Sequence, residues 1–327
     1  MSKQIIEKIN QLCSLESAVR KHINTTRYQN DLISDSDNWN QICCSLDTIG
    51  DTSYSISDYI ESDYPSKMGL KYIYTYGLLQ ALIIQQDAML HLSKAFKVTY
   101  KISEVLYGIR YIRNSAIGHP TKQNQGTPNG QTHFNYISRM TLSKNGFRLM
   151  KCYDQRKIEF LDVDLFKIID NQLDEIKSGC EAIVVILKEA DKMHKEKYKD
   201  DLLINIFHSI IGYHFEKIGE GIYSPNSSNI QFGLSRLKSV QKTYLKFENA
   251  LKERGDLTSY TQYDLDEYKH ALSMLEAYLE GSEHHMSESD ARIYHFYMCE
   301  QHKHFEEIAK EVDATYASET QTEVKNS

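Results

Sequence analysis

The sequence lacks the motifs that mark several large classes of enzyme. It contains no glycine-rich phosphate-binding loop, no Ser-His-Asp order and no G-x-S-x-G turn. These absences argue against nucleotide-dependent and acyl-transfer enzymes. The six cysteines include no C-x-x-C pair, and a chain of 327 residues can bury a substantial core without a disulfide or a metal.

Long apolar runs are also missing. The longest strongly apolar runs, such as AIVVIL at 182–187, are far shorter than the roughly 20 residues that span a bilayer. The first ten residues, MSKQIIEKIN, carry charges where a signal peptide needs an apolar core. We therefore expect a soluble, cytoplasmic protein that has no membrane partner.

The chain has no excess of positive charge. Its 38 Lys and Arg residues against 45 Asp and Glu residues give a net charge of −7, which argues against a protein that coats nucleic acid over its whole surface. An anionic substrate would have to meet a local basic patch. One segment, His91 to Lys122, supplies such charge, with Lys94, Lys97, Lys101, Arg110, Arg113 and Lys122 against Glu104 alone.

Most of the chain is patterned as α-helix. Apolar residues recur every three or four positions in long segments, which is the spacing of a core-facing helix. The expected helices include 70–96, 103–117 and 165–193, and three more follow between 203 and 279. We predict a mainly α-helical protein with a helical bundle over residues 1–195, a C-terminal helical domain over 196–315 and a disordered tail over 316–327.

A short β insertion is expected within the first domain. Two alternating segments, FNYISRMTL and FRLMKCY, flank Lys144-Asn145-Gly146. Asn-Gly between alternating runs favours a β-hairpin. IEFLDV, at 158–163, is a candidate third strand. The sequence therefore predicts a small antiparallel insertion at about residues 133–163.

The stretch RNSAIGHP, residues 113–120, places an arginine in the apolar stripe of a helix and a histidine just after its end. Gly118 suits the left-handed position that follows many helices, and Pro120 prevents the helix from continuing. The guanidinium of Arg113 matches phosphate oxygens, and His119 can take and give a proton near neutral pH. This pair is suited to cleaving RNA without a metal, a reaction that deprotonates a 2′-hydroxyl, stabilises a phosphorane and protonates the leaving oxygen.

An arginine, an adjacent polar residue, four further residues and a histidine at the end of a bundle helix resemble the signature of the HEPN superfamily. The resemblance covers about residues 50–195. It implies a helical bundle that forms a homodimer, so that two copies of the motif make one composite cleft. It also implies a metal-independent endoribonuclease of toxin–antitoxin or phage-defence systems. RNA is then the substrate, no metal or cofactor is expected, and an antitoxin or regulatory protein is a further partner.

The resemblance assigns roles to the motif residues. Arg113 would clamp the phosphate and His119 would act as general acid and base. Asn114 would orient the histidine or bind phosphate. Asp87 either holds Arg113 or is a polar flank of its helix. The candidate site residues are thus Arg113, Asn114 and His119 for catalysis, Arg110 and Lys122 for substrate binding, and Asp87 for positioning.

Other interpretations remain open from the sequence. In one toxin branch a tyrosine that a partner nucleotidyltransferase modifies follows the histidine by two residues, whereas this chain has Thr121 there. The main alternative function is a non-catalytic HEPN-like module that binds a partner protein or a nucleotide. A third interpretation is a structural scaffold, in which Arg113 pairs with Asp87 and His119 caps the carbonyl groups of the helix.

A second constellation lies near the C-terminus. It consists of His295, Cys299, His302 and Glu306, which share one face of a predicted helix and are all able to ligate zinc. Four ligands on one straight helix cannot surround a single ion, so we do not predict a metal site there.

Overall fold

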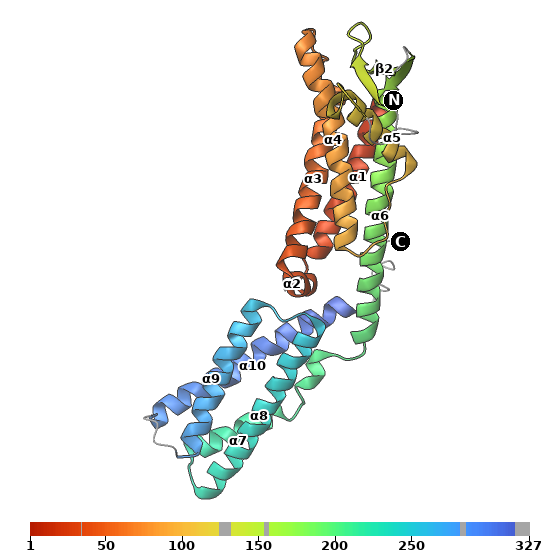
Figure 1. Ribbon diagram of the computed structural model, residues 1–327. Helices are drawn as coiled ribbons and strands as arrows, with labels where there is room; N and C mark the ends of the chain where they lie inside the picture. Colours follow the sequence, from red (N-terminus) through yellow and green to blue (C-terminus); the bar gives the residue numbers. More distant parts are fainter. Residues whose placement is uncertain (34, 124–131, 154–156, 282–285, 318–327) are drawn as a thin grey trace. The chain divides into compact units, whose positions relative to one another are not determined.

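The structure is a computed structural model that describes residues 1–33, 35–123, 132–153, 157–281 and 286–317 (Figure 1). The chain is mainly helical and carries one small three-stranded antiparallel sheet, as the sequence predicted. Within the described ranges, no helix has the length and apolar character needed to cross a membrane. The tail predicted to be disordered lies almost entirely outside the described residues.

The chain forms two compact units whose boundary differs from the predicted one. The first unit comprises Met1–Asn24 and Leu32–Lys188, and the second unit comprises Thr25–Asp31 and Glu189–Ser327. The predicted division after residue 195 therefore falls seven residues late, because the boundary lies inside helix α6, Leu165–Tyr198. A continuous helical pattern gives no sign of such a boundary. Helix α2, Thr26–Ile33, begins in the second unit.

The first unit is a bundle of long helices whose apolar stripes meet in one core. Its helices are α1 (Ser2–Ile23), α3 (Ser36–Glu61), α4 (Met68–Ala95), α5 (Glu104–Arg113) and most of α6. Side-chain caps fix two of the starts, since Asp35 accepts from the N–H of Asn38 and Ser103 from that of Leu106. Helix α3 packs on α1 and α4, and α4 packs on α5.

A fully buried layer of amides crosses this core. Gln172 of α6 donates to the carbonyl of Leu82 and to Oε1 of Gln85, both at 2.9 Å. Gln86 donates to Gln172 at 2.8 Å, and Gln85 donates to Ser53 of α3. The three glutamines are 0% exposed. These hydrogen bonds offset most of the cost of removing the amides from water, since of the three side chains only Oε1 of Gln86 has no partner among the described residues. They also fix the relative height of three helices.

The sheet contains β1 (His133–Ile137), β2 (Gly146–Tyr153) and β3 (Ile158–Asp164) in that order. The antiparallel β1–β2 hairpin and the third strand were correctly predicted, but β1 ends at Ile137, so eight residues join it to β2 instead of a short Asn-Gly connection. Gly146 instead pairs with Asp164 of β3. A Cβ atom at Gly146 would lie 2.0 Å from the carbonyl oxygen of Val163, so glycine is required there by close backbone approach.

Replacing Gly146 by alanine is therefore expected to destabilise the first unit by about 1–3 kcal/mol, the usual cost of overpacking. Thermal unfolding followed by circular dichroism measures this change. Gly50 of α3 is the matched control, since a Cβ there meets nothing within 4 Å. Gly50→Ala should be neutral or slightly stabilising, because alanine favours helix. Equal melting temperatures for wild type and Gly146→Ala would contradict the observed strand pairing.

The second unit is entirely helical in its described part. Its main helices are α7 (Ile211–Tyr223), α8 (Ser227–Arg254), α9 (Ser259–Leu279) and α10 (Glu288–Tyr316). The first of the three helices expected between 203 and 279 starts later than predicted, since a short 3-10 helix, Leu203–Ile206, precedes α7. The N–H groups of Leu203 and Ile204 donate to the carboxylate of Asp313, which ties this turn to α10.

Candidate functional site

The predicted motif lies where α5 changes its helical geometry. The α-helix ends at Arg113, and Asn114–Gly118 form a π-helical turn. The N–H of His119 closes this turn by donating to the carbonyl of Asn114 at 2.7 Å. The left-handed conformation predicted for Gly118 is wrong, because its φ is not positive. The wider turn ends the helix instead, and such turns often occur at functional sites.

Gly118 has a steric role in place of the predicted conformational one. A Cβ atom at this position would lie 3.2 Å from Nη1 of Arg113 and 3.4 Å from Oδ1 of Asn114. The absence of a side chain therefore lets the guanidinium lie against the backbone of the residue before His119. The turn therefore brings the guanidinium of Arg113 close to the backbone next to His119, although the two residues are six positions apart in the sequence.

Neutral side chains hold the guanidinium of Arg113. Its Nε and Nη2 donate to Oε1 of Gln80 on α4, at 3.1 and 2.7 Å, and Nη1 donates to Oδ1 of Asn114 at 2.8 Å. The side chain is half-buried. None of these acceptors carries a charge, so the positive charge of Arg113 is fixed in position without being neutralised. Gln80 was not predicted from the sequence.

Asp87 has a different partner from the one expected. Its carboxylate forms an ion pair with Arg110, one turn before Arg113 on α5. Asp87 therefore does not hold Arg113, and Arg110 is already paired with an acid rather than free for phosphate. The register of α5 against α4 decides this pairing, since Gln80 and Asp87 are two turns apart on the same face of α4.

Asn114 positions the arginine and not the imidazole. Its side chain accepts from Arg113, while its backbone carbonyl accepts from the N–H of His119. His119 is exposed, and no hydrogen bond to its imidazole is found among the residues that the structure describes. The ring is thus accessible to a substrate from solvent.

A buried polar network fixes the segment that follows His119. Oγ of Ser115 donates to Oε1 of Gln123 at 2.9 Å, and Nδ2 of Asn135 donates to the same oxygen at 3.0 Å. The N–H of Asn135 donates to the carbonyl of Pro120 at 2.7 Å. Strand β1 therefore secures both the π turn and the exit from it. Sequence reasoning missed these residues because isolated Ser, Asn and Gln carry no recognisable spacing.

The predicted basic patch is spread over both ends of α4 and α5. Lys94 lies 14 residues from Gln80 along α4, which is about 21 Å at 1.5 Å per residue. Because Gln80 contacts Arg113, Lys94 lies far from Arg113. Lys97 and Lys101, in the connection between α4 and α5, lie at that same distant end. Lys122 is exposed and close in sequence to His119. Residues 124–131 of the loop that follows Lys122 lie outside the described residues. The charge at the site itself is therefore carried by Arg113 and Lys122.

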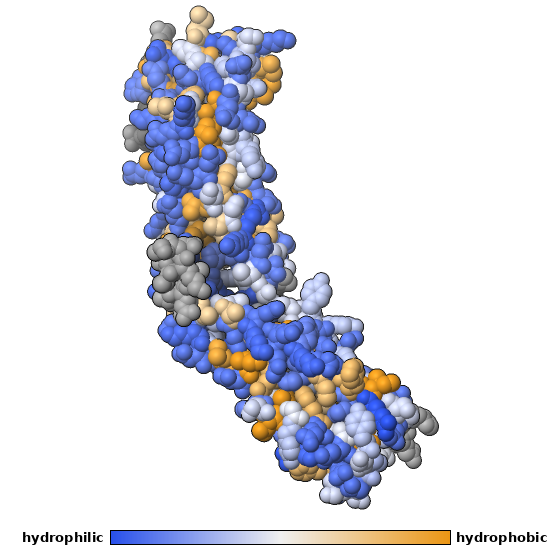
Figure 2. Space-filling view, turned by 180° about the vertical axis from the view of Figure 1, so that it is seen from behind, coloured by the Kyte–Doolittle hydropathy of each residue, from blue (hydrophilic) through white to orange (hydrophobic). Residues whose placement is uncertain are grey.

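An exposed apolar face surrounds the motif on α4 and α5. Ile73 is 63% exposed and Ile84 is 39% exposed, and both share the face of α4 that carries Gln80. Tyr107 of α5 is 60% exposed. Figure 2 shows that apolar side chains gather in separate patches on a mostly hydrophilic surface. Large exposed side chains of this kind on a helix pair are typical of an interface.

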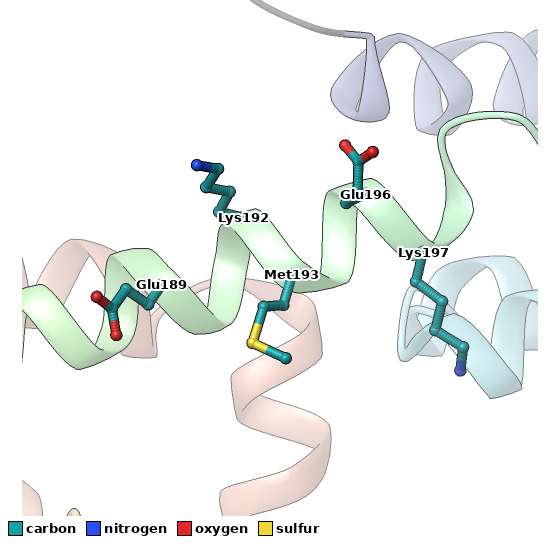
Figure 3. A pocket seen from close by; sticks show the side chains of 5 residues that line it. All are labelled: Glu189, Lys192, Met193, Glu196 and Lys197. Carbon is teal, nitrogen blue, oxygen red and sulfur yellow. The ribbon is translucent and has the colours of Figure 1, made fainter.

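A cavity of about 580 Å³ lies beside the end of α6 in the second unit. Figure 3 shows that Lys192 and Glu196 project from one side of the helix, and Met193 and Lys197 from the other. Charges of both signs thus alternate along a single helix and do not converge on one point. This surface is not a candidate catalytic site.

Two of the four residues weighed as zinc ligands, His295 and His302, make hydrogen bonds within the second unit. Nε2 of His295 contacts the carbonyl of Phe215 at 2.9 Å, and Nδ1 of His302 contacts the hydroxyl of Tyr244 at 2.7 Å. Burial lowers the pKa of both histidines. Among the described residues, no group of three or more potential ligands is placed to hold a metal ion.

These buried histidines predict a pH dependence of stability. Burial also lowers the pKa of His214. The pKa of each of these three imidazoles is therefore lower in the folded chain than the ordinary value of 6.5. The unfolded chain then binds more protons below about pH 6.5, and the stability of the second unit falls as pH falls. We expect calorimetry between pH 7.5 and 5.5 to show a falling melting temperature, with a shallower slope for His302→Gln. An unchanged or rising melting temperature would contradict this prediction.

No protein-family model, curated protein or solved structure matches this chain.

Proposed function

We propose that the first unit is a metal-independent endoribonuclease of the HEPN type. RNA is cleaved by attack of a 2′-hydroxyl on the adjacent phosphate, within a cleft shared by two copies of the chain. Arg113 binds the phosphate, His119 transfers protons, and Asn114 positions Arg113. Lys122 adds charge for substrate binding. Toxin–antitoxin or phage defence is the biological setting that the motif suggests.

The observation that carries this proposal is the state of Arg113. Arg110, one turn earlier on α5, is paired with the carboxylate of Asp87. Arg113 is instead held by two neutral amides, so its full charge remains available beside an accessible imidazole. A guanidinium that is fixed in position and not neutralised can stabilise the negative charge that develops on a phosphorane. It does not have to move during the reaction to do so.

The proton transfers call for two imidazoles or for one that acts twice. The attacking 2′-hydroxyl must lose a proton, and the leaving 5′-oxygen must gain one. A two-fold dimer places the same surface of each copy face to face and so pairs the two histidines. The exposed apolar face of α4 and α5 around Arg113 supports such a pairing. Its contact would exclude water from the two arginines and strengthen their attraction for phosphate.

Cleavage of RNA in the presence of EDTA tests the proposal. The purified protein is incubated with total cellular RNA and with a tRNA pool, and the product ends are analysed. Cleavage that leaves 2′,3′-cyclic phosphate and 5′-hydroxyl ends is expected, because the nucleophile belongs to the substrate. Absence of cleavage, both alone and after addition of cell extract, would reject the ribonuclease and favour the non-catalytic module that binds a partner protein or a nucleotide.

A further inference from the structure

An open groove of about 570 Å³ lies between α9 and α10 of the second unit. It is separate from the candidate ribonuclease site, which belongs to the first unit. The groove is lined by Tyr263, Asp266, Glu267, His270 and Ala271 of α9 and by Ile293, Tyr294 and Tyr297 of α10. Its volume is within the range of ordinary ligand sites, and its walls are two packed helices rather than loops.

The floor and walls of the groove are apolar and aromatic. Tyr294 and Tyr297 pack partly against the core of the second unit, while Ile293 is 65% exposed. One turn further along α10, Phe296 is also 65% exposed, and Tyr263 across the groove is 63% exposed. Covering these exposed side chains would be favourable, since burial of apolar surface contributes roughly 25 cal/mol per Å². This arrangement resembles the apolar grooves that bind amphipathic helices.

The charge around the groove is negative. Its lining includes two carboxylates, Asp266 and Glu267, and no Lys or Arg. An anionic polymer such as RNA is repelled from this surface. The occupant therefore has to be cationic.

One carboxylate in the groove is available for a cation. Glu267 accepts a hydrogen bond from the hydroxyl of Tyr263 at 2.6 Å, and among the described residues it has no ion pair with a Lys, Arg or His. Asp266, by contrast, already pairs with Lys269. Burial, and after it the charges of Glu267 and Asp264, raise the pKa of Tyr297, a residue that lines the groove.

We infer that the α9–α10 groove binds a cationic amphipathic helix of a partner protein. The apolar face of that helix packs on Ile293 and Tyr297, and an arginine or lysine reaches Glu267. The tyrosine rings add favourable contact with the same cation. A regulatory protein that restrains or activates the chain through its second unit is the kind of partner that fits. The inference stands whether or not the first unit cleaves RNA.

A pair of synthetic peptides tests the inference on the full-length protein. One is a labelled amphipathic helix of leucine and arginine, about 18 residues or five turns long, and the other has glutamate in place of arginine. Fluorescence anisotropy at moderate salt should detect binding of the arginine peptide and none of the glutamate peptide. Glu267→Lys should weaken the binding at least about 10-fold, as expected for a charge-assisted contact. Ile293→Ala, at an exposed position, should weaken it about 3-fold.

Glu216→Lys is the matched control, because the side chain of Glu216 on α7 is 65% exposed and lies outside the groove. It makes the same change in net charge and should alter the affinity less than 2-fold. Equal losses for the two lysine variants would overturn the inference, since attraction would then be long-range only. Failure of the arginine peptide to bind would overturn it as well. A change in sedimentation of the free protein with Glu267→Lys would assign the groove to a second copy of the chain instead.

Discussion

Replacing His119 by alanine is expected to lower RNA cleavage by about 100- to 10,000-fold, the usual contribution of a general acid or base. The imidazole is exposed at the end of the π turn, and no residue of the described chain depends on it for a hydrogen bond. The fold should therefore survive the change. Initial rates on a labelled oligoribonucleotide in EDTA measure the loss, and circular dichroism and sedimentation verify the fold and oligomeric state.

His91 supplies the control for this substitution. It is an exposed histidine on α4 of the same unit, and its Nδ1 contacts Nε2 of Gln41 at 3.2 Å. His91→Ala should cleave RNA at nearly the wild-type rate. If His119→Ala and wild type cleave equally, the activity belongs to another site or to a contaminant, and the assignment of His119 is wrong.

The second large effect is expected from Gln80→Glu, which keeps the shape of the side chain and changes its charge. A carboxylate at the position of the Gln80 amide would form a two-pronged ion pair with Arg113, since Nε and Nη2 already point at one oxygen there. The guanidinium would then be neutralised before RNA arrives. Cleavage and RNA binding should fall by on the order of 10- to 100-fold, while thermal stability is kept or increased.

The opposite change at the neighbouring pair is the control. Asp87→Asn removes the carboxylate from Arg110 and frees a positive charge on the same face of the helix pair. It should leave RNA binding unchanged or strengthen it. A structural role for Arg113 predicts the reverse order, with Gln80→Glu harmless and Asp87→Asn damaging, so the two variants together separate a phosphate clamp from a scaffold.

The helical elements were predictable because apolar spacing is a local property. The pattern over 70–96 corresponds to α4, Met68–Ala95, and the segment at 158–163 corresponds to β3. Helix ends and turns were less predictable. The sequence assigned Gly118 to a positive φ and Gly146 to a hairpin turn. At both positions the structure instead places other atoms of the chain so close that a Cβ atom would crowd them. Such proximity is a product of tertiary packing.

The candidate site was predictable in its chemistry and not in its pairings. The sequence identified Arg113 and His119, because their side chains have few substitutes for binding phosphate and moving protons. It offered Asp87 as a partner of Arg113 and left open that Asp87 is only a polar flank of its helix. The register between α4 and α5 instead pairs Asp87 with Arg110 and places the amide of Gln80 against Arg113. Nothing in a single sequence sets that register, so Gln80 could not be found.

The amide layer around Gln172 restricts how the first unit can move. Sliding α6 by one turn, about 5.4 Å, would separate Gln172 from Leu82, Gln85 and Gln86 at once. Each buried amide left without a partner costs about 1–3 kcal/mol, so such a shifted state is too rare to act as a signal. The first unit is therefore unsuited to shear motions of its core helices. Any switch that acts on Arg113 has to work through the π turn, through the loop after it, or through pairing with a second chain.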